Sequence, residues 1–108
     1  MPASPEDRFA ELVDALAGLP GVTPPEQGPG RRFGSAALKV DGRIFAMLVD
    51  DRLVLKLPLG RVSELVTAGE GEHFERGGRP MREWLALDPE SAVGWLPLAQ
   101  EARAFVAG

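Results

Sequence analysis

The single histidine of the chain, His73, stands in an acidic stretch and is the first candidate for chemistry. Glu70, Glu72 and Glu75 surround it, so an imidazole and several carboxylates could together hold a metal ion. Transition-metal sites normally include a second histidine or a cysteine thiolate, and the chain contains no cysteine. This stretch therefore favours a solvated polar turn, and we expect no metal and no cofactor.

Two further motifs match known sites only in part. Gly28, Gly30 and Gly34 have nearly the spacing of a dinucleotide-binding loop, but they precede an expected strand, whereas a bound phosphate needs a helix N-terminus behind the loop. Ser35 lacks the Gly-x-Ser-x-Gly pattern of a hydrolase nucleophile and forms no evident triad with His73. We interpret the glycines as a loop and the serine as a small packing residue.

Two acidic pairs, Asp50 with Asp51 and Glu70 with Glu72, could in principle divide acid and base roles. Both pairs fall in turn-like, solvated positions, where the pKa of a carboxyl group changes little. The chain also lacks an activated nucleophile, a metal cluster and a cofactor loop. We therefore expect no catalytic residues, and we expect the chain not to be an enzyme.

Basic residues concentrate in the middle of the chain. Residues 31–61 carry seven basic and three acidic side chains, whereas the segments before and after them are acidic. Alternation along a strand puts Lys39 on the same side as Arg31, and Lys56 on the same side as Arg52. The register between strands is open, so a shared face for Lys39 and Lys56 is a hypothesis, and a solvated outer face is the simpler alternative. The candidate partner-binding residues are Arg31, Lys39, Arg43, Arg52 and Lys56.

The N-terminal half predicts one helix followed by strands joined by hairpins. The run Ser4–Asp7 combines a hydroxyl cap, a proline and two acids near the positive end of the helix dipole, which predicts a helix over 5–17. Residues 18–30 contain too much proline and glycine for regular structure and predict a loop. Three strands are expected over 31–58, because the tripeptides DGR and DDR separate apolar runs as hairpin turns do.

A second helix is expected over 60–69, followed by strands at 73–76 and 81–87. Apolar residues at helical spacing and a terminal glycine indicate the helix, and a Gly-Gly turn separates the two strands. Trp84 and Trp95 are interpreted as core or core-edge residues rather than as platforms for a ligand.

The last element is an expected helix over 89–106. The tripeptide DPE at 88–90 repeats the cap, proline and acid of the first helix start. Because a proline in a helix interior removes a backbone hydrogen bond, the helix is either kinked or split, with a new helix starting near Pro97. The order is α-β3-α-β2-α. The predicted fold class is α+β, with an antiparallel sheet and helices mainly on one face.

Length and composition indicate one globular domain over residues 1–108, with frayed ends at 1–4 and 107–108. Hydrophobic residues make up 44% and charged residues 26% of the chain, as in ordinary folded domains. A net charge of -4 argues against a general nucleic-acid binder. The absence of cysteine, of a leader and of a long apolar run predicts a cytoplasmic protein without membrane contact.

Short motifs in both halves resemble a known group of proteins. The first half contains Phe33-Gly34, Asp41-Gly42-Arg43, Phe45-Ala46 and Leu55-Lys56. The second half contains Phe74-Glu75-Arg76, Gly78-Arg79-Pro80-Met81, Trp84-Leu85, Trp95 and Glu101-Ala102. Over most of the chain this pattern resembles the TfoX N-terminal domain and the MmcQ/YjbR family. The resemblance implies a secretion-chaperone-like fold and bacterial, cytoplasmic, non-enzymatic relatives, some with a suggested DNA-associated or regulatory role.

The sequence thus predicts a small binding or regulatory domain. Its basic middle segment and the family resemblance favour an acidic partner, with nucleic acid as one possibility. A protein partner, a homodimer or a chaperone-like role is the alternative, by analogy of fold alone. An enzyme is the least favoured of the three.

Overall fold

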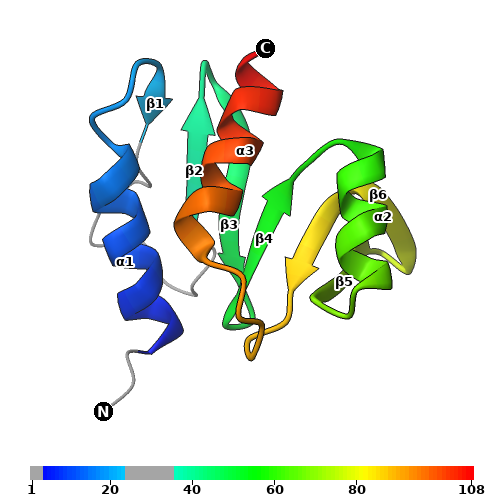
Figure 1. Ribbon diagram of the computed structural model, residues 1–108. Helices are drawn as coiled ribbons and strands as arrows, with labels where there is room; N and C mark the ends of the chain where they lie inside the picture. Colours follow the sequence, from blue (N-terminus) through cyan, green and yellow to red (C-terminus); the bar gives the residue numbers. More distant parts are fainter. Residues whose placement is uncertain (1–3, 24–35) are drawn as a thin grey trace.

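The computed structural model describes residues 4–23 and 36–108 of the chain. Within this part, three helices and a six-stranded antiparallel sheet form an α+β fold, as predicted (Figure 1). The helices are α1 (Pro5–Leu16), α2 (Leu59–Thr67) and α3 (Trp95–Ala107). The strands are β1 (Val22–Thr23), β2 (Ala36–Val40), β3 (Arg43–Val49), β4 (Arg52–Lys56), β5 (Gly71–Arg76) and β6 (Arg79–Leu87). None of the described helices combines the length and apolarity needed to cross a membrane.

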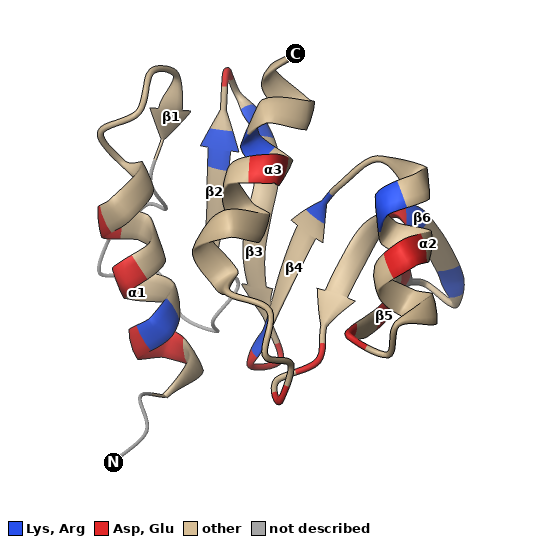
Figure 2. Cartoon of the chain, viewed as in Figure 1, with Lys and Arg blue, Asp and Glu red and all other residues tan. Residues whose placement is uncertain are grey.

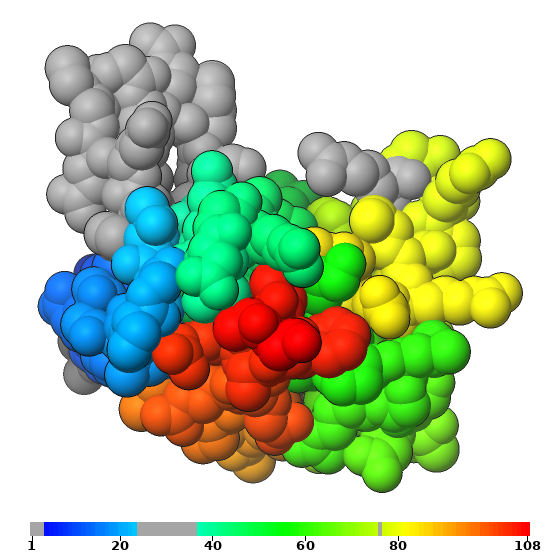
Figure 3. Space-filling view, turned by 90° about the horizontal axis from the view of Figure 1, so that it is seen from above, coloured from blue at the N-terminus to red at the C-terminus, as the bar shows by residue number. Residues whose placement is uncertain are grey.

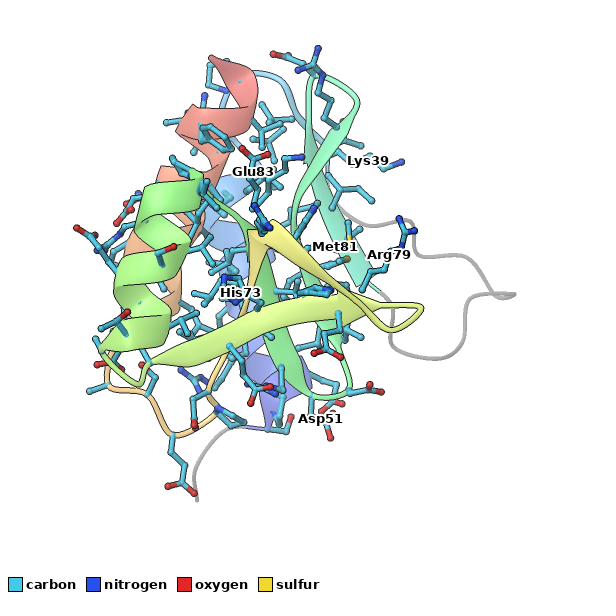
Figure 4. All side chains as sticks on the ribbon, turned by 90° about the vertical axis from the view of Figure 1, so that its right-hand side faces the viewer. Lys39, Asp51, His73, Arg79, Met81 and Glu83 are labelled. Carbon is cyan, nitrogen blue, oxygen red and sulfur yellow. The ribbon has the colours of Figure 1, made fainter. Side chains whose placement is uncertain are left out.

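The described helices lie on one face of the sheet, and the residues that the structure describes place no helix on the other face (Figures 1 and 4). The strand order is β1-β2-β3-β4-β6-β5, and every neighbouring pair is antiparallel. α2 carries the chain from β4 past the position of β6 to β5, and β6 then returns beside β4. The sheet is therefore assembled from a local meander and a hairpin that joins it across a helical connection.

β1 is a strand that sequence analysis did not predict. Residues 18–30 were expected to form a loop, but Val22 pairs with Val40 and Thr23 with Lys39. Gly21 adopts a φ of 78°, which turns the chain after α1 into this short pairing. The expectation of a loop is wrong at 22–23, because the free edge of β2 supplies a partner that local composition does not reveal.

Three two-residue turns close the hairpins. Asp41-Gly42, Asp50-Asp51 and Gly77-Gly78 all have positive φ at both positions. Two successive left-handed residues match the right-handed twist of the strands they join, so the predicted hairpins at all three places are confirmed. The β3–β4 turn achieves this with two aspartates, at φ values of 50° and 66°, where glycine would be free of backbone strain.

The ends of the helices follow local capping chemistry, with one correction. Ser4 Oγ accepts a hydrogen bond from the backbone N–H of Asp7 at 3.1 Å, and α1 begins at the next residue as predicted. The predicted helix start at 88–90 is wrong. Asp88 Oδ1 instead accepts from the N–H of Glu90 at 2.8 Å, which forms a turn, and α3 begins seven residues after Asp88, at Trp95. Pro97 falls in its first turn, where no N–H is needed.

The core lies between the helices and one face of the sheet. Leu53, Leu55 and Leu57 are fully buried there, on the side that strand alternation predicts. Leu55 stands opposite Leu85 of β6, so β4 and β6 contribute a continuous apolar row. The helices cover this row with Phe9, Leu12, Leu16, Val62, Leu65, Leu98, Ala99 and Ala102.

The close approach of β5 to β6 gives a stability prediction. A Cβ atom at Gly71 would lie 2.5 Å from the carbonyl oxygen of Ala86, so Gly71→Ala should lower the free energy of unfolding by about 1–3 kcal/mol through overpacking. Gly60→Ala is the matched control. A Cβ there meets nothing within 4 Å, and alanine is favoured in a helix by roughly 0.5–1 kcal/mol. Urea unfolding measures both, and equal effects of the two variants would contradict the register of β5.

Candidate functional site

The helix-free face of the sheet carries three of the predicted basic residues, Lys39, Arg52 and Lys56, whereas Arg43 pairs with the core residue Val40. Ala37, Met47, Val54 and Ala86 form one cross-strand row through β2, β3, β4 and β6. Lys39 and Lys56 follow Ala37 and Val54 by two residues in their strands. The register therefore places both lysines on this face, as the sequence hypothesis proposed, and Lys39 points away from the helices in Figure 4.

Three of the predicted residues line one cleft. Lys39 near the end of β2, Arg43 at the start of β3 and Lys56 at the end of β4 surround a cavity of about 580 Å³. The antiparallel strands bring these positions to the same end of the sheet. The last turns of α3 form the opposite wall, and Figure 3 looks onto this end of the molecule, with the C-terminal end of α3 beside the β2–β3 hairpin. We call it the cationic cleft.

Apolar side chains form the walls of the cationic cleft. Ile44 of β3, Trp84 of β6 and Phe105 of α3 line it, and each is half-buried. Trp84 stands directly opposite Lys56 across the β4–β6 pair, and the Lys56 ammonium lies 5.5 Å from the centre of the indole ring. The cleft therefore combines positive charge with an aromatic surface in one place.

The three cations of the cleft differ in whether a carboxylate lies near them. Lys56 Nζ lies 3.9 Å from Glu83 Oε1, with the two side chains 34% and 48% exposed. Lys39 and Arg43 are exposed, and among the described residues neither has a carboxylate within ion-pair distance. Within the part of the chain that the structure describes, two of the three cations in the cleft can therefore meet an anion without first losing an ion pair.

Arg52 lies at the other end of β4 and has a different role. Its Nε donates to the carbonyl oxygen of Leu87 at 3.2 Å, and its Nη2 donates to that of Ala86 at 3.1 Å. Nη1 lies 3.6 Å from Glu72 Oε1. The guanidinium thus ties β4 to β6 and β5, and the structure does not bring it to the cationic cleft.

Several sequence candidates fall outside the described residues. These are Arg31 of the partner-binding set, the loop glycines Gly28, Gly30 and Gly34, and Ser35. His73 lies in β5, which confirms the strand predicted over 73–76, and it is half-buried opposite Leu85. The interpretation of its acidic surroundings as a solvated polar turn is wrong there, because the chain pairs with β6 already from Gly71. Among the described residues no group of three His, Cys, Asp or Glu side chains could hold a metal ion.

Acidic residues gather at one end of the molecule, around the β3–β4 turn and the segment after β6 (Figure 2). Arg52, at the start of β4, and Arg8, in the first turns of α1, are basic residues at that end. Three of the predicted cations lie in the cationic cleft at the other end, together with the acidic Asp41 of the β2–β3 turn and Glu83 of β6. The net charge of -4 therefore hides a local positive region, and such a region can guide an anion by its field.

The acidic end contains one perturbed carboxyl group. A hydrogen bond with Glu6 of α1, followed by the negative charge of Glu6, raises the pKa of Asp51 above its ordinary value. The α1 N-terminus and the β3–β4 turn thus place two carboxyl groups side by side. The two carboxylates repel each other when both are charged, and protonation of Asp51 relieves this repulsion.

The sequence interpretation missed the aromatic and apolar walls of the cleft. Trp84 was assigned to the core or its edge, but Leu85 and Leu87 take the core side of β6, which leaves Trp84 and Ala86 on the other face. That alternation is visible in the sequence. What it could not show is that β6 pairs with β4, which is the step that brings Trp84 to Lys56.

No protein-family model matches the chain, and no curated protein matches it. Function is therefore inferred from the residues and the geometry of the cationic cleft.

The carboxyl pair at the acidic end predicts a pH-dependent stability effect. The folded state holds a proton on Asp51 more tightly than the unfolded state does, so this site's contribution to stability is present at low pH and is lost as the pH rises through the raised pKa. Asp51→Asn should therefore raise the melting temperature at about pH 7 and change it much less at about pH 3. Thermal unfolding followed by circular dichroism measures the shift.

Asp41→Asn is the matched control, because Asp41 also has a positive φ, of 52°, in the β2–β3 turn. Asparagine tolerates this backbone conformation as well as aspartate does. A gain of the same size in both variants at neutral pH would contradict the role of the carboxyl pair.

Proposed function

We propose that this chain is a non-enzymatic binding domain whose cationic cleft takes an acidic partner, with nucleic acid as the favoured class. The observation that carries the proposal is the convergence of Lys39, Arg43 and Lys56, from three different strands, on one cleft beside Trp84. The resemblance to the TfoX N-terminal and MmcQ/YjbR proteins supports the same function. A secretion-chaperone-like topology, bacterial origin and cytoplasmic location belong to this proposal.

Phosphate groups suit the chemistry of these side chains. Arg43 offers a planar fork that can bind two phosphate oxygens, and a lysine adds a compact point charge. A domain with so few cations and an acidic remainder gains only a few phosphate contacts, so the binding is weak and strongly salt-dependent. Local charge, rather than net charge, then determines where the nucleic acid binds.

Association with a protein is the second candidate, and a different observation favours it. Leu59 in α2 is 47% exposed and Leu96 in α3 is 38% exposed, which are the large apolar side chains that the described surface leaves open. Two separate leucines form a smaller signal than the cleft, because single apolar side chains are common on protein surfaces. Nucleic acid therefore remains the favoured partner.

Fluorescence anisotropy at low salt tests the nucleic-acid proposal. Labelled DNA should bind wild-type protein with a dissociation constant of roughly 1–100 µM, the range of non-specific binding. Lys39→Glu and Lys56→Glu should each weaken binding about tenfold, because each replaces attraction to phosphate with repulsion. Three contacts predict a slope near -2 for the logarithm of affinity against the logarithm of salt on single strands, from about -0.7 per contact.

Arg79→Glu is the control for the change in net charge. Arg79 is exposed on β6 and does not line the cleft, so its reversal should weaken binding less than either lysine reversal. Absence of binding at about 100 µM protein, or equal loss in all three variants, would reject the cleft as a nucleic-acid site.

A further inference from the structure

We propose that the cationic cleft receives one unpaired nucleotide at a time, and hence that its ligand is a single strand of nucleic acid. This inference rests on the proposed function and names the form of nucleic acid that the site takes. The base would lie against Trp84, while the phosphates on either side would meet Lys39, Arg43 and Lys56.

The shape of the site separates single strands from duplexes. The cleft is concave and has a volume of about 580 Å³, within the range of roughly 300–1,000 Å³ that holds small organic ligands. A duplex presents a convex phosphate surface with its bases stacked inside. An unpaired base can leave the stack and enter a cavity of this size, as single-strand-binding proteins require.

The walls of the cleft are apolar and aromatic, which suits contact with a nucleobase better than contact with water. Ile44, Trp84 and Phe105 come from three different elements and give the cavity apolar and aromatic sides. A nucleobase offers a flat π-face of any sequence to such a ring. The backbone pairing of β6 with β4 and the full burial of the next residue, Leu85, fix the place of Trp84.

The cations stand where the phosphates of such a nucleotide would be. The Lys56 ammonium lies 5.5 Å from the centre of the Trp84 ring, so a phosphate bound by Lys56 lies beside a base stacked on the indole. Lys39 and Arg43 are exposed at the rim of the same cleft, where a strand continuing past the site would place its neighbouring phosphates.

The carboxylate of Glu83 competes with the phosphate of the ligand for Lys56. Its carboxylate lies 3.9 Å from Lys56 Nζ, and a phosphate arriving at Lys56 must take its place. Removing the charge of Glu83 should therefore strengthen binding. A gain in affinity is a useful result, because a partly unfolded variant cannot produce it.

The fluorescence of Trp84 can be used to test whether a base stacks on its indole ring. In a Trp95→Phe background, Trp84 is the sole indole of the chain. Oligothymidylate of about ten nucleotides, which covers one site of the size found in single-strand-binding folds, should quench its emission and bind at least about tenfold more tightly than a DNA hairpin duplex. Trp84→Leu should weaken single-strand binding about tenfold, the usual loss for one stacked base. Glu83→Gln should strengthen it severalfold, with circular dichroism confirming the fold of each variant.

Three results would overturn the inference, and they are distinguishable from one another. Equal binding of single strand and duplex, without quenching of Trp84 but with loss in Lys39→Glu and Lys56→Glu, would leave the proposed function standing and reject the unpaired nucleotide. Thymidine 5′-monophosphate binding as tightly as the oligonucleotide would show a site for free nucleotides instead. No binding of any of the three probes would reject both proposals.

Discussion

Pairing of β4 with β6 is the constraint on which the rest of the structure depends. The two strands are separated along the chain by α2 and β5, so their pairing joins the N-terminal meander to the C-terminal hairpin. It sets Leu55 opposite Leu85 on the core face and Lys56 opposite Trp84 on the other. Arg52 reinforces it through bonds to carbonyl groups at the end of β6. One strand pair therefore builds both the core and the cleft.

Local chemistry made most of the elements predictable. Capping by Ser4, the Asp41-Gly42 turn and the alternation of Leu53 and Leu55 in β4 each depend on residues close in the chain, and the structure agrees with all three. β1 could not be predicted in the same way. A strand of two residues has little propensity of its own and exists because the edge of β2 offers it hydrogen bonds.

The helix start expected at Asp88 shows a second limit, because one local signature serves two structures. An aspartate followed by proline caps a helix only if the chain continues helically, and otherwise its side chain closes a turn on the residue two positions later, as it does on the N–H of Glu90. The prediction of the candidate site shows the same limit of local signals. Alternation correctly grouped side chains within a strand, but only the register between strands shows that Lys39 and Lys56 share a cleft while Arg52 stands apart.

The two faces of β4 explain why the position of each charge matters more in this protein than the net charge does. Its core-side leucines and its outward Lys56 alternate along five residues, so the strand cannot shift by one residue without placing an ammonium group among apolar side chains. Burial of the leucines therefore fixes the position of Lys56 in the cleft as well as the register of the sheet. Charged residues on the helices and turns can vary without changing this register, and together they are mainly acidic. The register of the fold, in contrast, fixes the cations whose positive field acts at the cleft.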